Sequence, residues 1–172
     1  MLQIAVALLY FTNKVFLSLE KKAGWQIGIL ASIFAIFYFI QLKLYLLLGL
    51  ELGFFCILIF GLLNHSGTNA NKKALYILMI GLMALLFVIL KNSTWIEFLI
   101  STLFILAIYF LANKNWNLGW TLMLIGHVFM AYFTFEQKQT FFASMQVCSI
   151  FVALFAIIKK QFYIKRSLRV KM

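Results

Sequence analysis

Two stretches of this chain begin with the same pair of residues: GWQIGILASIFAIFYFIQL at residues 24–42 and GWTLMLIGHVFMAYFTF at residues 119–135. Each has about the 20 apolar residues that a helix needs to cross the hydrocarbon core of a bilayer. Each is followed by a short loop that contains a lysine, Lys43 or Lys138, and then by another apolar stretch. The matching order predicts a repeated helical unit inside a membrane.

The composition of the chain also indicates a protein that lives in lipid. Its 172 residues are 65% hydrophobic and only 11% charged, and their mean hydropathy is +1.03. A soluble globule of this size could not hide that much apolar surface, because its exterior must be covered by polar groups. We therefore predict an all-α membrane protein whose seven transmembrane helices lie at residues 3–20, 24–42, 44–64, 73–90, 95–112, 117–135 and 140–158.

The predicted helices divide into three, one and three within a single transmembrane domain. Its parts are repeat one at 3–64, a linker helix at 73–90, repeat two at 95–158, and a basic tail at 159–172. Because the linker helix adds one crossing, both repeats enter the membrane in the same direction. Parallel three-helix repeats of this kind are typical of SWEET-like carriers, which hold their substrate near the midplane.

The basic residues are distributed unevenly along the chain, which carries a net charge of +11. Eleven loop and tail cations fall on one side of the predicted membrane and three on the other. The positive-inside rule then puts the N-terminus outside and the C-terminus in the cytoplasm. We expect a bacterial-type inner membrane, a tail that binds anionic lipid, and no nucleic-acid partner.

Two polar residues stand at matching places in the predicted repeats. Sliding 24–65 onto 119–160 superposes Glu51 on Gln146. Glu51 lies roughly 12 Å below the outer surface, where a carboxylate is a functional-site candidate. The alternative is a structural ion pair with Lys14 in the first helix. The amide of Gln146 has hydrogen-bonding groups that lipid cannot satisfy, so it either binds substrate or joins helices.

One helix face in the second repeat combines an aromatic ring with a hydrogen-bonding group. His127 follows Trp120 by seven residues, so the two share a face. Such a face suits a flat heteroaromatic ligand. The alternatives are an interfacial anchor for the tryptophan and a packing role for the histidine. The predicted substrate-binding set is Trp120, His127, Glu51, Gln146, Trp25 and Asn13, with Ser32 as a weaker candidate.

Residues that catalysis or metal binding require are missing from the sequence. There is no aspartate, and Cys56 and Cys148 stand alone in apolar stretches. His65 and His127 share no ligand spacing with an acidic residue, and no glycine-rich phosphate loop or nucleophile elbow occurs. We therefore expect a protein that is not an enzyme and uses neither a cofactor nor a metal.

Further motifs surround these positions. The first half carries LEKKAGW at 19–25, GIL at 28–30, KLY at 43–45 and Glu51. The second half carries YFLANK at 109–114, followed by Trp120. Over nearly the whole chain these residues resemble the patterns L-A-x-K…W-x-x-G-I…L-Y…Q and L-L-A-x-K…N-W of PnuC-type vitamin transporters.

The resemblance implies the three-one-three fold and facilitated uptake of nicotinamide riboside, with relatives that carry thiamine, riboflavin or deoxynucleosides. Family uptake is passive and is made directional by a cytoplasmic kinase. The family pattern W-x-x-W-x-x-x-N on the sixth helix is met here by Trp120, Met123 and His127, and Glu51 stands where a glutamine is common. These departures bear on the substrate more than on the fold.

Together these features predict an inner-membrane facilitator for a small aromatic, vitamin-type solute. Nicotinamide riboside is the leading substrate and thiamine the alternative, since both carry a fixed positive charge on a ring that Glu51 can balance and a tryptophan can stack against. A second alternative is the substrate-binding subunit of an ATP-driven vitamin importer. Its Ala-x-x-x-Ala docking motif is absent from the first helix, IAVALLY at 4–10. The sequence leaves open whether the chain forms a homo-oligomer.

Overall fold

A computed structural model describes residues 2–41, 45–67, 72–89, 94–138 and 140–169 of the chain. Within these ranges the protein forms seven α-helices and no β-strand, which confirms the all-helical class. The helices are α1 (Leu2–Ser18), α2 (Lys22–Gln41), α3 (Tyr45–His65), α4 (Lys72–Ile89), α5 (Trp95–Ala112), α6 (Trp116–Glu136) and α7 (Thr140–Arg169).

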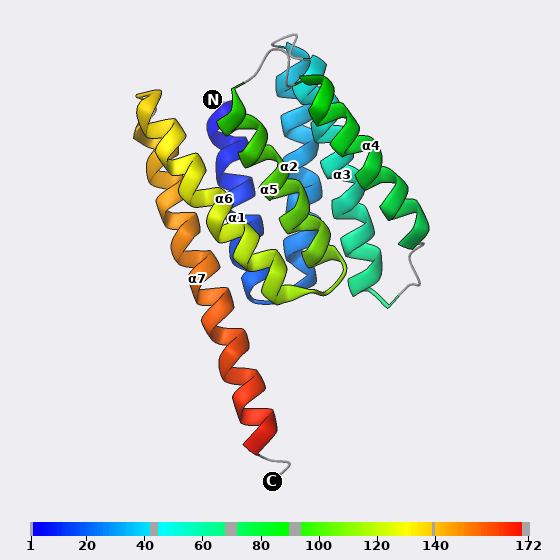
Figure 1. Cartoon of the computed structure of the whole chain (residues 1–172), viewed down its shortest axis with the longest axis vertical. Coiled ribbons are helices and arrows are strands. Elements are labelled where there is room, and N and C mark those ends of the chain that lie inside the picture. Colours follow the sequence, from blue (N-terminus) through cyan, green and yellow to red (C-terminus); the bar gives the residue numbers. More distant parts are fainter. Residues whose placement is uncertain (1, 42–44, 68–71, 90–93, 139, 170–172) are drawn as a thin grey trace.

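Six of the seven predicted helices begin and end within two residues of the observed bounds. The exception is α7, which was predicted to end at residue 158 and in fact continues to Arg169. Residues 159–169 contain no glycine or proline, and lysine and arginine favour helix, so the sequence has no signal that stops it. The basic segment therefore continues the last helix beyond the rest of the bundle (Figure 1). The predicted loop marker Lys43 lies outside the described residues.

The outer surface of the bundle is apolar. Among the residues that the structure describes, four helical segments are long and apolar enough to cross a membrane: Lys22–Gln41, Trp95–Ala112, Trp116–Glu136 and Thr140–Phe162. Two shorter segments, Ile4–Ser18 and Glu51–His65, are also apolar. Large apolar side chains such as Ile77 and Phe151 are more than two-thirds exposed on the isolated chain, at 69% and 67%. Such a surface is unfavourable in water and matches a lipid environment.

Six helices pack in a closed cycle. Helices α1, α2 and α3 contact one another in sequence, as do α5, α6 and α7, and the cycle is closed by contacts of α3 with α5 and of α1 with α7. We call these last two contacts the seams. Helix α4 packs only at the side, against α3 and α5 (Figure 1).

The chain direction alternates regularly between the two ends of the bundle, which we call the upper and lower ends as drawn in Figure 1. Helices α1, α3, α5 and α7 all run from the upper end to the lower end. The first helix of each group of three, α1 and α5, therefore enters the bundle in the same direction.

The turns that follow α1 and α5 have the same backbone conformation. Glu20 and Lys114 both adopt the left-handed region, with φ of 58° and 62°. In each turn this residue donates its N–H to the carbonyl three residues back, and the next residue donates to the carbonyl five residues back, over 2.8–3.0 Å. This pair of bonds is the Schellman motif that ends a helix.

The two Gly-Trp pairs lie just beyond these turns. A Cβ atom on Gly24 would lie 2.7 Å from the backbone nitrogen of Leu17, and one on Gly119 would lie 2.6 Å from Cγ of Leu111. The glycines thus allow α2 and α6 to approach the preceding helix closely. The tryptophan after each glycine is buried, with exposed fractions of 1% and 2%. Each pair therefore plays the same packing role in its own group of three helices.

Candidate functional site

Several polar side chains in the interior form two clusters, both away from the helix ends. The first, which we call the Glu51 cluster, consists of Tyr10, Ser32 and Glu51 from α1, α2 and α3. The second, which we call the His127 cluster, consists of Lys14, His127, Gln146 and Ser149 from α1, α6 and α7. Both clusters draw on α1, because Tyr10 and Lys14 are four residues apart and share one helix face.

The hydroxyl of Tyr10 holds the Glu51 cluster together. It donates a hydrogen bond to the carboxylate of Glu51 and lies 3.0 Å from the hydroxyl oxygen of Ser32, which is fully buried. The tyrosine ring meets Phe54 edge-on, with ring centroids 6.1 Å apart. A carboxylate in an apolar interior is strongly unfavourable without such partners. The cluster therefore surrounds the carboxyl group of Glu51 with hydroxyls from two other helices.

A histidine and a glutamine from adjacent helices form the core of the His127 cluster. Nδ1 of His127 lies 2.7 Å from Oε1 of Gln146, so this ring nitrogen carries the proton and donates it. The other ring nitrogen, Nε2, has no hydrogen-bond partner among the described residues. It is buried, since the side chain is only 1% exposed. The ring of Phe104 lies beside the imidazole at 4.9 Å between centroids. An unpaired nitrogen in this position can receive a polar group of a ligand.

Lys14 extends from α1 into the same cluster. Its ammonium donates to the hydroxyl of Ser149 over 3.3 Å, and that hydroxyl in turn donates to the carbonyl of Met145. The lysine thus links the first group of helices to a serine of the second, across the α1–α7 seam.

The ion pair considered between Glu51 and Lys14 is not formed. The carboxylate accepts a hydrogen bond from Tyr10, and the ammonium donates to Ser149. All four acidic residues of the chain lie in the described ranges, and among these residues the one ion pair joins Glu20 to Lys160. Glu51 and Lys14 therefore lie apart in the interior, each hydrogen-bonded to uncharged partners.

Of the six predicted site residues, the structure brings His127 and Gln146 into direct contact and places Glu51 in the other cluster. Trp120 is buried in the apolar core, on the same helix as His127. Trp25 lies at the lower end, where its ring stacks on His65 at 5.0 Å between centroids.

Asn13 is used in packing between α1 and α2. Its amide donates to the carbonyl of Gly24 over 2.7 Å, and a Cβ atom on Gly28 would lie 2.6 Å from the same amide nitrogen. The side chain is buried. In this structure Asn13 and Trp25 therefore stabilise the first group of three helices, away from the Glu51 and His127 clusters.

Sequence reasoning did not include Tyr10 or Ser149 in the site, and it considered Lys14 only as a structural partner. Signals for two of them were present, because Tyr10 lies one helical turn before Lys14 and Ser149 follows Gln146 by three residues. Residues at these spacings share a helix face, so a polar residue in a membrane helix predicts further polar residues one turn away.

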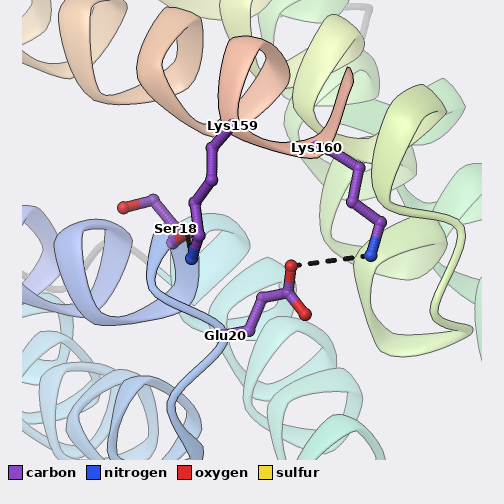
Figure 2. Close-up of polar contacts among 4 residues, drawn as sticks. All are labelled: Ser18, Glu20, Lys159 and Lys160. Carbon is purple, nitrogen blue, oxygen red and sulfur yellow. Dashed lines mark hydrogen bonds and ion pairs between the residues drawn. The ribbon is translucent and has the colours of Figure 1, made fainter. Parts of the chain in front are cut away.

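The α1–α7 seam is tied at the lower end by two lysines. Figure 2 shows Lys160 paired with Glu20 in the turn after α1, with Nζ and Oε1 3.5 Å apart, and Lys159 reaching back toward Ser18. Lys159 donates to the backbone carbonyl of Ser18 over 3.2 Å. Lys160 also lies 5.8 Å from the ring centroid of Trp116. Helix α7 is thereby fastened to the end of α1.

The α3–α5 seam is also tied at the lower end. The amide of Asn64 donates to the carbonyl of Ala112 over 2.8 Å. Beside this seam, His65 of α3 meets the ring of Trp116, the first residue of α6, edge-on at 5.4 Å between centroids. At the upper end, side-chain hydrogen bonds among the described residues stay local, as in the Thr94–Glu97 capping box and the bond from Ser144 to the carbonyl of Thr140. Polar ties between the two groups of helices thus concentrate at one end.

Comparison of the chain with known protein families, with curated proteins and with solved structures finds no match. The resemblance to PnuC-type transporters therefore stays a prediction from the sequence motifs.

Proposed function

We propose that the protein is an inner-membrane facilitator for a small aromatic solute of the vitamin type, with nicotinamide riboside as the leading substrate and thiamine as the alternative. The observation that carries this proposal is the pair of polar clusters inside an otherwise apolar bundle. Hydroxyl, carboxylate, amide, imidazole and ammonium groups from five helices occupy the interior. Membrane proteins keep such groups in the interior chiefly for solute or ion pathways.

A repeat architecture of two parallel three-helix units fits this function. Exchanging α1 with α5, α2 with α6 and α3 with α7 converts one seam into the other and leaves the contact cycle unchanged. The matched turns at Glu20 and Lys114 and the matched glycines Gly24 and Gly119 support the same correspondence. In carriers built from parallel repeats, one unit moves against the other around a site between them. The His127 cluster, which contains residues from both units, lies at such a boundary.

The lysine ties suggest which side of the carrier is closed. The positive-inside rule assigns the lower end, with Lys159 and Lys160, to the cytoplasm. Both seams are tied there. The structure is therefore consistent with a state closed to the cytoplasm, and transport requires the contacts between Glu20, Lys160 and Trp116 to separate.

The clusters offer complementary groups to a heteroaromatic cation. Glu51 provides negative charge at one side of α1, and the amide of Gln146 provides a hydrogen-bonding group at the other. Phe104 offers an aromatic face beside His127. A ring that carries a fixed positive charge is favoured near a carboxylate and an aromatic face. This is why nicotinamide riboside and thiamine precede the uncharged riboflavin as candidates.

Uptake into liposomes tests the proposal directly. The purified protein should carry labelled nicotinamide riboside or thiamine until the concentrations inside and outside are equal, with no ATPase present. Glu51→Gln should slow this uptake, whereas Glu136→Gln, which changes an exposed carboxylate, should not. Accumulation driven by a proton or sodium gradient would contradict facilitated diffusion. Uptake that requires an added ATPase would instead favour the importer-subunit alternative.

A further inference from the structure

One face of α7 is directed away from the bundle and is apolar. The opposite face is buried against α1 and α6, as the buried residues Ser149, Ala153 and Ala156 show. On the outward face, four apolar side chains are more than half exposed and follow one another at spacings of three or four residues, which keeps them on one side of the helix. They are Phe151, Phe155, Ile158 and Phe162. We call this set the apolar stripe, and its exposure matches contact with lipid chains.

The same face becomes basic beyond the apolar stripe. Lys165, Arg166 and Arg169 follow Phe162 by three, four and seven residues, and α7 stays helical to Arg169 (Figure 1). Helix register therefore places these three positions on the continuation of the stripe. They lie about 5–10 Å further along the helix axis than Phe162. The headgroup layer on each side of a bilayer is roughly 5–8 Å thick, so the three basic residues stand at headgroup depth.

The structure divides the basic residues of α7 between two uses. Lys159 and Lys160 are occupied at the α1–α7 seam, where they contact Ser18 and Glu20 (Figure 2). The three basic positions that follow Phe162 lie beyond this seam. No acidic residue follows Glu136 in the chain, so the helix that carries these positions offers them no counter-charge.

We propose that Lys165, Arg166 and Arg169 bind the headgroup of an anionic phospholipid whose acyl chains lie along the apolar stripe. Basic residues close to a membrane surface attract anionic lipids, and arginine also matches the geometry of a phosphate group. A nucleic acid would be attracted by the same charges but would not use an apolar stripe that leads directly to them. Lipid is therefore the partner that fits both parts of this face. The site does not depend on which solute the protein carries.

Native mass spectrometry of the purified full chain in detergent tests this inference. The chain is titrated with phosphatidylglycerol and with phosphatidylcholine of the same acyl chains. The first phosphatidylglycerol should bind at a concentration at least about tenfold lower than the first phosphatidylcholine. The triple variant Lys165→Gln, Arg166→Gln, Arg169→Gln should abolish this preference. The matched double variant Lys159→Gln, Lys160→Gln removes charge from the same helix and should retain it, because both lysines belong to the seam.

Two further variants keep the test independent of folding. Arg169→Gln alone should weaken phosphatidylglycerol binding severalfold, and Lys22→Gln, which changes an exposed lysine of α2, should leave it unchanged. Equal binding of the two lipids would overturn the site. A preference that survives the triple variant, or that is lost in the double variant, would overturn the assignment to these three residues. Displacement of the bound lipid by an equal concentration of short duplex DNA would overturn the choice of lipid as the partner.

Discussion

The two groups of three helices share a frame and differ in their interiors. In both, a left-handed turn ends the first helix, a glycine lets the second helix approach it, and a buried tryptophan follows. Inside the first group, the polar residues Tyr10, Ser32 and Glu51 satisfy one another. Inside the second, His127 retains a nitrogen without a partner among the described residues, and Lys14 of α1 donates to Ser149. The two halves therefore share the same turn and the same Gly-Trp packing, but their interior polar side chains differ.

This difference distinguishes polar groups that stabilise the fold from polar groups that are free to accept a ligand. A buried polar group whose partners are complete is held in place, and removing a partner destabilises the fold. A buried group with a missing partner is available to a ligand. The Glu51 cluster is closer to the first case and the His127 cluster to the second.

Removing the buried tryptophans should break the shared frame with the largest effect. Trp25→Ala and Trp120→Ala should each lower the free energy of unfolding by about 3–5 kcal/mol, because each deletes a buried aromatic side chain. Unfolding of the purified protein in detergent measures the change. Trp95→Ala is the control, since that side chain is 77% exposed and should have little effect. A large loss in one half only would show that the two pairs do not play the same role.

Changes to the two clusters should show the contrast between the interiors. Tyr10→Phe leaves the carboxylate of Glu51 without its hydroxyl donor and should destabilise the protein by about 3 kcal/mol. Gln146→Leu removes the partner of a neutral imidazole and should destabilise it by about 1–2 kcal/mol. The same unfolding assay applies, with the exposed Tyr132→Phe as control. The contrast is contradicted if Gln146→Leu proves the more damaging change.

Adding one methyl group at the close helix contacts should have an intermediate effect. Gly24→Ala and Gly119→Ala should each destabilise the protein by about 1–3 kcal/mol, since a Cβ atom would overlap Leu17 or Leu111. Gly81→Ala is the matched control, because no atom lies within 4 Å of the added carbon. That change should stabilise α4 by up to about 1 kcal/mol. Equal effects at all three glycines would show that close approach is not the cause.

The lysine tie at the lower end should contribute the least to stability. Lys160→Gln and Glu20→Gln should each change the free energy of unfolding by less than about 1 kcal/mol, because both side chains are partly exposed. The same variants should nonetheless raise the rate at which a maleimide labels a cysteine placed at Ser18, in a background without Cys56 and Cys148. Lys22→Gln serves as the control. An unchanged labelling rate would mean that the tie does not hold the seam closed.

Much of the helical layout was predictable from the sequence, because it depends on local composition. The bounds of six helices follow from runs of apolar residues separated by short polar loops. The predicted end of α7 was wrong because a basic segment without glycine or proline continues that helix. Depth in the membrane predicted matched heights for Glu51 and Gln146, with His127 nearer the helix centre, and one shared cavity. The structure instead joins His127 to Gln146 and places Glu51 with Tyr10. The same reasoning could not foresee that Trp25 would stack on His65, since that contact depends on how α2 and α3 pack together.

The sequence by itself determined that the chain is helical, that its exterior is apolar, and that the second helix of each half opens with the same Gly-Trp pair. These properties follow from hydropathy and local backbone preference, which act over a few residues. Only the tertiary structure decided that Tyr10 rather than Lys14 holds Glu51, and that Lys14 reaches Ser149 on α7 instead. The physical reason is that tertiary packing fixes how far each helix is rotated about its axis. Of the polar residues at one depth, this rotation decides which ones come into contact.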